Sequence, residues 1–572
     1  MATPPPNRLN DRRVAQAHAE VGQTAISRSV ALALTGVLFM ATTAVPMTQL
    51  WLAPEVWRVA SGAAVTSEVT GDAQPTGTLV AQVVMRNRRL LEVISTLTDQ
   101  VDNESLLARH LRPVVQLFLT RIAGAGNERV YVGRDGWLFY AADVQHVVGP
   151  GFLDETHLAR RAASGNSLAA APEADPRPAL LAFNEALADR GITLVLMPTP
   201  VKPAIHPEQL TSLAAAAPLR NLSFTQFRDE MQAAGVLVFD PAPLLAATRG
   251  PGAPTYLSGD THWRPDAMQA VATALGEFLT EETALPPGNP TALTTRAVTV
   301  SNRGDTLDLL GLPEEWSPAA ADIVTIRQVG TPDGAPWQPS PTAEVLLLGD
   351  SFSNIYSLGS MGWGRGAGLA EQLSVALARP IDRVAQNDNG AFATRAALAR
   401  DLARNPDRLA ATRVVVYQFA TRELSQGDWR LVELDGWSPS ASRPSSPEPG
   451  PRAAVLSPTP GRRLTVRGLV RQRAAAPRPG TVPYRDHIIA LELADIAGND
   501  PTVDGTVALV YLSSMEDNVW TPAATLPAGA VVTLSLRPWT EVAPERDGIA
   551  RAELVDGAVV FAQPWWGELA TP

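Results

Sequence analysis

The sequence predicts an α/β protein built on a doubly wound, mostly parallel sheet, with an N-terminal transmembrane helix before it and a small all-β domain after it. Three observations predict this class. Apolar runs alternate with stretches of helical periodicity over residues 126–435, an uncharged run covers residues 29–54, and short runs of alternating polarity fill residues 461–572. Strands that alternate with helices are typical of parallel sheets, and short strands without helices are typical of barrels and sandwiches.

The N-terminal segment is expected to anchor the chain in the inner (cytoplasmic) membrane as a single span. Residues 29–52 are long and apolar enough to cross a bilayer, and the tail before them, residues 1–28, carries most of the flanking arginines. This asymmetry places the tail in the cytoplasm and the remaining chain in the periplasm or outside. A signal peptide cleaved near Ala44 and a buried core helix are the alternatives. Residues 53–125 have helical periodicity and would form a stalk or a cap.

Residues 126–435 are expected to hold the α/β domain. An entry hairpin comes first, with Arg134-Asp135-Gly136 as its turn. Lys202 and His206 follow the first apolar run, near the carboxyl end of a strand, where open α/β sheets place their sites. Both could line a pocket, but we expect them at the surface. The apolar runs predicted to be strands lie at 192–198, 236–240, 322–328, 344–348 and 414–419.

The C-terminal part differs from the α/β domain in its composition and in its pattern of apolar residues. Residues 436–460 form a Pro/Ser-rich linker, and residues 461–572 are predicted to form a β-barrel or sandwich. Trp520, Trp539 and Trp565 belong to a dense set of aromatic residues there. Aromatic faces stack on sugar rings, so a carbohydrate-binding domain is one interpretation. The alternative is that these rings fill a small core.

Composition excludes several kinds of site. The net charge of −11 argues against a nucleic-acid partner, and the chain has no cysteine for disulfides, thiolate metal sites or thiol nucleophiles. The seven histidines are scattered, without the spacing of metal ligands. Asp260 and His262 could supply two ligands, but the sequence indicates no third, so no metal is expected.

Two short stretches supply the groups of a Ser-His-Asp triad. Asp260 and His262 belong to the segment Asp-Thr-His-Trp, and alternate residues of an extended segment point to the same side. Ser351 lies in Gly-Asp-Ser-Phe-Ser, directly after an apolar run that should be a buried strand. A serine at such a strand-to-turn junction is exposed as a nucleophile and lies near backbone N–H donors. The three residues therefore predict acyl-transfer chemistry.

These motifs carry a resemblance to a known family. Gly349-Asp350-Ser351 with a downstream Asn-Gly resembles the SGNH hydrolase superfamily, although here Asp260 and His262 precede the serine. That permuted order, together with Gly136-Trp137-Leu138-Phe139-Tyr140 and Arg422-Glu423-Leu424, resembles the SGNH-like O-acetyltransferases of bacterial exopolysaccharide export, such as the alginate O-acetyltransferases. The resemblance covers about residues 126–430. It implies a permuted SGNH-like fold in which Ser351 is the nucleophile, His262 the base and Asp260 its orienting partner.

The resemblance also suggests residues around the triad. SGNH enzymes use a Gly and an Asn in separate loops as oxyanion donors, and Asn389 or Gly390 would fill one such role. Arg422 would form a local ion pair with Glu423 that supports the site, or else contact the substrate.

The predicted function is transfer of an acetyl group onto hydroxyls of a secreted polysaccharide. The resemblance implies no bound cofactor and a multipass membrane O-acyltransferase partner that supplies the acetyl group, directly or on an acetylated carrier. A carbohydrate acetylesterase with the same triad is the alternative enzyme, since both reactions pass through an acyl-enzyme. A non-catalytic scaffold that binds polysaccharide during export is the alternative from another class.

Overall fold

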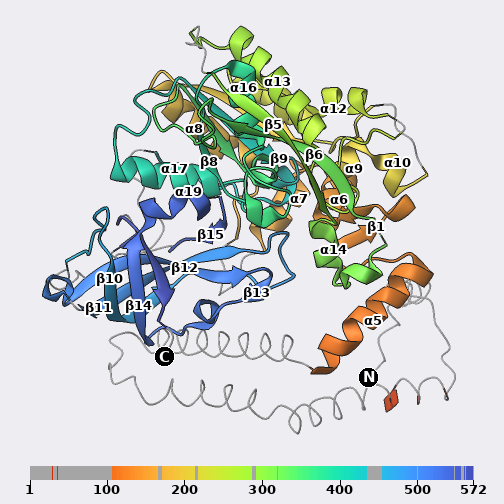
Figure 1. The fold of residues 1–572 in the computed structure, drawn as a ribbon. Coiled ribbons are helices and arrows are strands. Elements are labelled where there is room, and N and C mark those ends of the chain that lie inside the picture. Colours follow the sequence, from red (N-terminus) through yellow and green to blue (C-terminus); the bar gives the residue numbers. More distant parts are fainter. Residues whose placement is uncertain are drawn as a thin grey trace, which may run out of the picture. The chain divides into compact units, whose positions relative to one another are not determined.

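The computed structural model describes the chain from residue 106 onward with short gaps, together with four helical positions near the N-terminus (Figure 1). The chain separates into two units, Met1–Val114 and Val115–Pro572. The predicted anchor at 29–52 lies outside the described residues except for Ser29, Leu32, Thr35 and Gly36. Helix α5 (Leu106–Ala123) agrees with the helical periodicity predicted for the end of segment 53–125. Within the parts of the chain that the structure describes, no helix is long and apolar enough to cross a membrane. The described ranges are 106–164, 171–212, 217–250, 252–286, 292–318, 320–434, 454–498, 500–546, 548–554, 559–560 and 562–570.

A five-stranded sheet forms the centre of the α/β domain. Its strands follow the order β4-β3-β9-β7-β8, and every neighbouring pair is parallel. This confirms the predicted parallel α/β domain. The strands are β3 (Thr193–Thr199), β4 (Leu237–Val238), β7 (Val345–Gly349), β8 (Asp382–Ala385) and β9 (Val414–Ala420).

Helices cover both faces of this sheet, which explains its uninterrupted apolar strands. In β7, Val345 and Leu347 pack into one hydrophobic cluster and Leu346 and Leu348 into the other. Helices α13 (Pro265–Glu282) and α16 (Leu369–Leu377) contribute to the first cluster. The second cluster includes α8 (Pro176–Ala188), α11 (Phe224–Ala233) and α17 (Ala393–Arg404). The shorter helices of the domain are α6 (Ala141–Val148), α7 (Glu155–Ala162), α9 (Lys202–Ile205), α10 (Pro207–Leu210), α12 (Ala242–Thr248), α14 (Asp305–Leu310), α15 (Ser351–Asn354) and α18 (Glu423–Gln426).

Two antiparallel ribbons lie outside the central sheet. The predicted strand at 322–328 exists as β6 (Asp322–Gly330), but it pairs with β5 (Thr294–Asn302) and not with the parallel strands. Its alternating burial explains the difference, because a ribbon covered on one face needs apolar residues only at every second position. The predicted entry hairpin is confirmed as β1 (Val130–Val132) paired with β2 (Leu138–Tyr140).

The C-terminal domain is a closed barrel, which decides between the two predicted architectures. Strand β10 pairs with β11 and β14, β12 pairs with β11 and β16, and β14 pairs with β16, so the ring closes. Only the β12–β16 contact within this ring is parallel. This order, first-second-third-fifth-fourth, is that of the OB-fold barrel. The strands are β10 (Leu464–Arg473), β11 (His487–Gly498), β12 (Thr506–Glu516), β14 (Val531–Pro538) and β16 (Trp565–Leu569); β13 (Val519–Trp520), β15 (Ala550–Ala552) and α19 (Ala543–Arg546) are appended to them.

Burial corrects part of the sugar-stacking hypothesis. Trp565 is fully buried in the barrel core and donates to the Leu456 carbonyl oxygen at 2.8 Å. Trp539 is also buried, edge-on to Tyr511. Neither ring offers a face to a sugar, because both fill core space. Trp520 is half-buried on β13, so its role stays a prediction.

Candidate active site

The serine motif forms a tight turn at the carboxyl end of β7. Ser351 is the first residue of α15, and the preceding Asp350 caps that helix by accepting from the Phe352 N–H at 2.9 Å. The Asp350 carboxylate also accepts from the Ala420 N–H at 2.6 Å and from the Gln418 amide at 2.9 Å. These bonds fasten the turn to the neighbouring strand β9, so the serine has a fixed position.

A buried lysine binds the backbone of the Asp-Thr-His-Trp loop. The Lys202 ammonium group donates to the carbonyl oxygens of Leu257 at 3.0 Å, Ser258 at 3.2 Å and Asp260 at 2.6 Å. It also lies 5.2 Å from the Phe139 ring centroid, so the predicted hairpin packs against it. The surface position expected for Lys202 is wrong, because three carbonyl oxygens compensate for its burial.

His206 is buried as well, contrary to the expectation. Its Nε2 atom accepts from the Thr255 N–H at 3.1 Å, just upstream of the histidine loop. Lys202 and His206, which follow β3, therefore hold the backbone of the loop that carries His262.

The three predicted triad residues come together. The Ser351 hydroxyl lies 2.8 Å from His262 Nε2, and His262 Nδ1 lies 2.6 Å from Asp260 Oδ1. All three side chains are buried, at 1–3% exposure. The loop and the serine turn are also joined directly, because the Trp263 indole donates to the Phe352 carbonyl oxygen at 3.1 Å. This is the geometry in which a histidine deprotonates a serine hydroxyl.

Two groups that donate hydrogen bonds to the Asp260 carboxylate were not predicted from the sequence. The Trp363 indole donates to Asp260 Oδ2 at 2.8 Å, and the Asp305 N–H donates to the same oxygen at 3.1 Å. Trp363 lies in the glycine-rich segment after the serine and Asp305 follows Gly304, and neither has a motif spacing that links it to Asp260.

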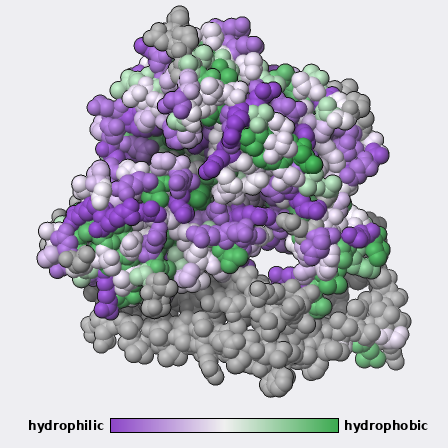
Figure 2. Space-filling model, in the orientation of Figure 1, coloured by the Kyte–Doolittle hydropathy of each residue, from purple (hydrophilic) through white to green (hydrophobic). Residues whose placement is uncertain are grey.

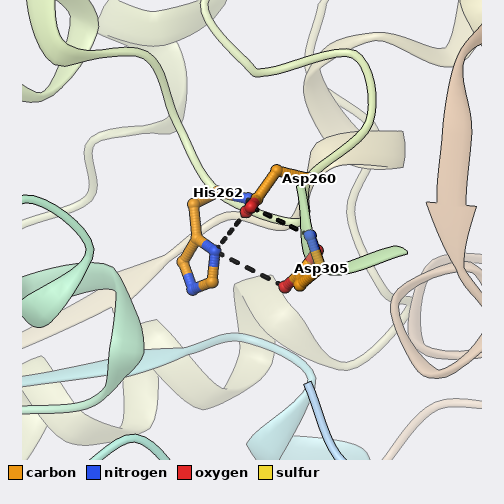
Figure 3. Close-up of side chains that lie close together, drawn as sticks. All are labelled: Asp260, His262 and Asp305. Carbon is orange, nitrogen blue, oxygen red and sulfur yellow. Dashed lines mark hydrogen bonds and ion pairs between the residues drawn. The ribbon is translucent and has the colours of Figure 1, made fainter. Parts of the chain in front are cut away.

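Asp260, His262 and Asp305 lie close together (Figure 3), so each affects the pKa of the others. Burial lowers the pKa of His262, but the Asp260 carboxylate outweighs it, so the pKa lies above its usual value. Burial acts to raise the pKa of Asp260, yet His262 and the hydrogen bonds from Trp363 and Asp305 bring it below its usual value. Burial and the nearby Asp260 charge raise the pKa of Asp305 to about 7. Asp260 is therefore the group that carries the charge beside the imidazole.

Asp305 supplies the third possible metal ligand, which the sequence did not indicate beside Asp260 and His262. One ligand atom from each lies within 4.8 Å of the others, which a metal ion could bridge. However, the histidine ring nitrogens already face Asp260 and Ser351, and Thr261 donates to Asp305 through its hydroxyl at 2.6 Å and its N–H at 2.9 Å. Hydrogen bonding accounts for the cluster without an ion.

Arg422 lies beside the serine turn with a different partner from the one expected. Its guanidinium group lies 3.1 Å from Asp143 Oδ1 and 5.9 Å from the ring centroid of Phe352, the residue after the serine. Glu423 instead accepts from the Ala391 N–H at 3.1 Å. The expected pair with Glu423 is thus replaced by a buried pair with Asp143 on α6, because that carboxylate is fully enclosed and needs a cation.

The predicted oxyanion residues lie in the loop between β8 and α17. Asn389 is exposed, and its carbonyl oxygen accepts from the Phe392 and Ala393 N–H groups. Gly390 packs behind the turn, where an added Cβ would lie 3.3 Å from Asp350 Oδ2. Asn387, two residues earlier, is 6% exposed and accepts from the Asn354 amide at 2.9 Å, one turn after the serine. Asn387 therefore contacts α15, the helix that begins at Ser351, whereas the sequence predicted that Asn389 or Gly390 would lie near the serine.

Comparison with known proteins places this domain. Residues 130–421, just over half of the chain, match the family described as SGNH hydrolase-like domain, acetyltransferase AlgX. A curated relative, the probable alginate O-acetylase AlgJ of Pseudomonas putida KT2440, is 26% identical over 198 residues, which cover 34% of this chain and 46% of the relative. The match thus spans less than half the length of that relative.

Two solved structures are also similar to this chain. The O-acetyltransferase domain of Pseudomonas putida AlgJ has 24% identity and a TM-score of 0.39, with coverage of 52% of this chain and 93% of that one. Pseudomonas aeruginosa AlgX has 14% identity and a TM-score of 0.36, with coverage of 72% and 91%. By the family match over residues 130–421, the chain belongs to the AlgX-type family of SGNH hydrolase-like acetyltransferase domains.

Proposed function

We propose that this protein is an O-acetyltransferase that carries an acetyl group on Ser351 and passes it to a hydroxyl of a secreted polysaccharide. The observation that supports the proposal best is the hydrogen-bonded series from the Ser351 hydroxyl through His262 to Asp260, with distances of 2.8 and 2.6 Å. Family membership supports acetyl transfer over other acyl chemistry.

The first half-reaction forms the acetyl-enzyme. His262 Nε2 accepts the proton of the Ser351 hydroxyl while the oxygen attacks the acetyl carbonyl of the donor ester. Asp260 accepts from Nδ1, which holds the tautomer with a free Nε2 and stabilises the imidazolium. The imidazolium then returns its proton to the departing donor oxygen, and the acetyl group remains on the serine.

The second half-reaction runs the same steps in reverse with a sugar. His262 takes the proton of the acceptor hydroxyl, whose oxygen attacks the acetyl carbon, and the proton returns to Ser351 as the new ester leaves. The Ser351 N–H and the Asn387 side chain are the groups that we assign to the negative carbonyl oxygen. The predictions for Asn389 and Gly390 remain alternatives, and Arg422 beside Phe352 would add positive charge near the donor or acceptor.

The proposal extends to the location and the partners of the reaction, which are expectations from the sequence. An anchor at residues 29–52 would hold the catalytic domain outside the cytoplasm, away from acetyl-CoA. We therefore propose that a multipass membrane acyltransferase or an acetylated carrier supplies the acetyl group, with no bound cofactor on this chain. The curated relative is named as an alginate O-acetylase, which supports a polysaccharide acceptor.

Product analysis tests transfer against hydrolysis. The protein from about residue 106 onward is incubated with 4-nitrophenyl acetate, with and without an acetyl-free oligosaccharide, and both acetate and acetylated sugar are measured. We expect acetylated sugar to form at the expense of acetate, and Ser351→Ala to abolish both. If acetate alone forms with every acceptor, the protein is an esterase. If neither forms with a folded protein, the polysaccharide-binding scaffold replaces the enzyme as the better account.

A further inference from the structure

One face of helix α5 packs on the α/β domain. Thr120 on this face is buried, and Leu117 packs against the apolar cluster formed by β1, β2 and α14. The Gln116 amide donates to the carbonyl oxygen of Gly126, just beyond the end of the helix, at 3.2 Å. Residues three or four positions apart share one side of a helix, so these side chains form a single inner face.

The opposite face of α5 is apolar and exposed. Phe118 is 58% exposed, Ile122 72% and Val115 53%. Leu111 and Val114, which are also exposed, continue the same face toward the start of the helix. Figure 2 shows hydrophobic residues at the surface along the helix labelled α5 in Figure 1. Large apolar side chains that are exposed side by side mark an interaction surface, and these five residues are the α5 stripe.

Arginines border the α5 stripe. At about 3.6 residues per turn, Arg112 falls on one side of the stripe and Arg121 on the other, and both are exposed. The sequence of α5 holds three arginines and no carboxylate, although the whole chain has a net charge of −11. The helix is therefore a basic element of an acidic protein.

An anionic bilayer surface matches this combination. Amphipathic helices with arginines beside an apolar face lie in the membrane interface, where the apolar side chains reach the lipid tails and the guanidinium groups stay at the phosphates. A second copy of the α5 stripe is a poorer match, because it would bring arginines against arginines. An acidic chain is repelled by anionic lipid except where its own charge is positive, so the charges also favour one orientation.

We infer that the α5 stripe binds the surface of an anionic phospholipid bilayer and holds the catalytic domain against it. The inner face of α5 packs on α14, and Asp305, the first residue of α14, donates to the Asp260 carboxylate. Contact through α5 therefore brings α14 and the Asp260 loop close to the bilayer. The anchor expected at residues 29–52 would keep the helix within reach of that surface. The inference concerns where the domain lies and does not rest on acetyl transfer by Ser351.

Single-cysteine variants of the full chain test the position of the stripe, since the chain has no cysteine of its own. Phe118→Cys and Ile122→Cys each carry a nitroxide label, in vesicles of phosphatidylethanolamine and phosphatidylglycerol. Electron paramagnetic resonance measures collisions of the label with oxygen, which concentrates in lipid, and with a nickel chelate, which stays in water. We expect both labels to meet oxygen and exclude nickel, at a depth of about 5–10 Å. Leu222→Cys, an exposed leucine before α11, is the control and should meet the nickel chelate.

Arginine variants test the role of charge. Arg112→Gln or Arg121→Gln, each made in the labelled Phe118→Cys chain, should lower the ratio of inserted to free label about fivefold. Arg160→Gln removes an exposed arginine from α7 instead, and this matched control should leave the ratio unchanged. Vesicles of phosphatidylcholine, which carry no net charge, should lower the ratio more than either single variant does, because all three arginines of α5 then lose their lipid partners.

Three results would overturn the inference. Labels that meet both reagents freely would show that the α5 stripe faces water. Labels that meet neither reagent would show that protein covers the stripe, either another segment of this chain or a second copy. Equal insertion into charged and neutral vesicles, or with and without the arginines, would show that anionic lipid is not the partner. None of these readouts depends on enzyme activity, so a failure of acetyl transfer is distinguishable from a failure of this inference.

Discussion

The Asp260 carboxylate is buried and still charged, because N–H groups surround it. The backbone of His262 donates to one oxygen at 3.1 Å, and the Trp363 indole and the Asp305 backbone donate to the other. Hydrogen bonds to the charged form of an acid favour that form. The charge in turn keeps the pKa of His262 above its usual value. Asp260 thus acts on the serine through the histidine.

Asp260→Asn should slow acetylation of Ser351 by on the order of 10⁴-fold, because the amide no longer selects the histidine tautomer with a free Nε2. Loss of the carboxylate also removes the largest contribution that raises the pKa of His262, so the acid limb of the pH–rate profile should move to lower pH. Rates of 4-nitrophenyl acetate consumption across pH measure both effects. An unchanged acid limb would contradict the assigned role of Asp260.

Lys202 is the second buried residue whose surroundings change its pKa. Burial lowers the pKa of Lys202 to about 8, well below the ordinary value of 10.5. Between these values the unfolded chain binds more protons than the folded one, so this group makes the protein more stable as pH rises from about 8 to 10.5.

Lys202→Met should remove that pH dependence and leave three carbonyl oxygens without their donor, which costs about 1–3 kcal/mol of unfolding free energy. Urea unfolding of wild type and variant at pH 7, 8, 9 and 10 measures it. Lys202→Arg, which keeps a charge but is bulkier and stays protonated, is the control. If the difference between wild type and Lys202→Met does not change with pH, the pKa of Lys202 is the same in the folded and unfolded states, which contradicts the lowered pKa.

The triad could be predicted from the sequence because its members occur in short motifs, but the residues that support it could not. Lys202 is a single lysine after a strand, and nothing in its neighbours shows that three carbonyl oxygens will enclose it. Asp305 and Trp363 reach Asp260 from positions 45 and 103 residues away in the chain. Such contacts depend on how the loops fold back, which periodicity does not report.

At the scale of elements, the turn after β5 positions the Asp260 loop. Gly304 has a φ of +91°, and a Cβ there would lie 2.2 Å from the Gly259 carbonyl oxygen. The glycine thus lets Asp305 approach Asp260. The β5–β6 ribbon that carries this turn was predicted in part, because its alternating pattern marks a strand but not its partner.

Gly304→Ala should lower the acetylation rate at least about 100-fold and destabilise the fold by more than about 2 kcal/mol, since both the positive φ and the backbone contact oppose a side chain. Gly334→Ala is a matched control, because Gly334 has a φ of +88° at the other end of the ribbon with open space around it. It should cost about 1–2 kcal/mol and leave the rate unchanged. Thermal unfolding and ester consumption distinguish the two, and equal effects would show that the close approach does not matter.

At the scale of the whole described unit, an ion cluster joins the barrel to the α/β domain. Glu553 of the barrel lies 3.3 Å from Arg400 on α17 and 2.8 Å from Arg551, and it accepts from the Tyr511 hydroxyl at 2.9 Å. Burial acts to raise the pKa of Glu553, but the two arginines outweigh it and lower the pKa to about 2. This group therefore stabilises the folded state fully above about pH 4.5 and loses that contribution as pH falls toward 2.

Glu553→Gln should destabilise the protein by about 3–5 kcal/mol at neutral pH, because two arginines lose their counter-charge in a buried place. The effect should shrink in acid. Glu568→Gln, which breaks an exposed pair with Arg537, is the control and should cost less than about 1 kcal/mol. Urea unfolding followed by tryptophan fluorescence measures both. Equal costs for the two variants would mean that the Glu553 cluster contributes no more than a surface pair.

The barrel itself could be predicted from its short alternating runs, yet its place beside the triad could not. Tyr484 and Arg485 look like ordinary polar loop residues in the sequence. Only the folded chain brings them within reach of Asp388 and Asp308, across a separation of about a hundred residues or more.

The proposed function depends on the acetylation of Ser351. It is tested most directly by peptide mass spectrometry after brief exposure of the protein to 4-nitrophenyl acetate at neutral pH, with acceptor omitted. We predict one added acetyl group on the peptide that contains Ser351, none on that peptide in His262→Ala, and its loss when acceptor sugar is added. A folded wild-type protein whose Ser351 peptide never gains an acetyl group would contradict the account.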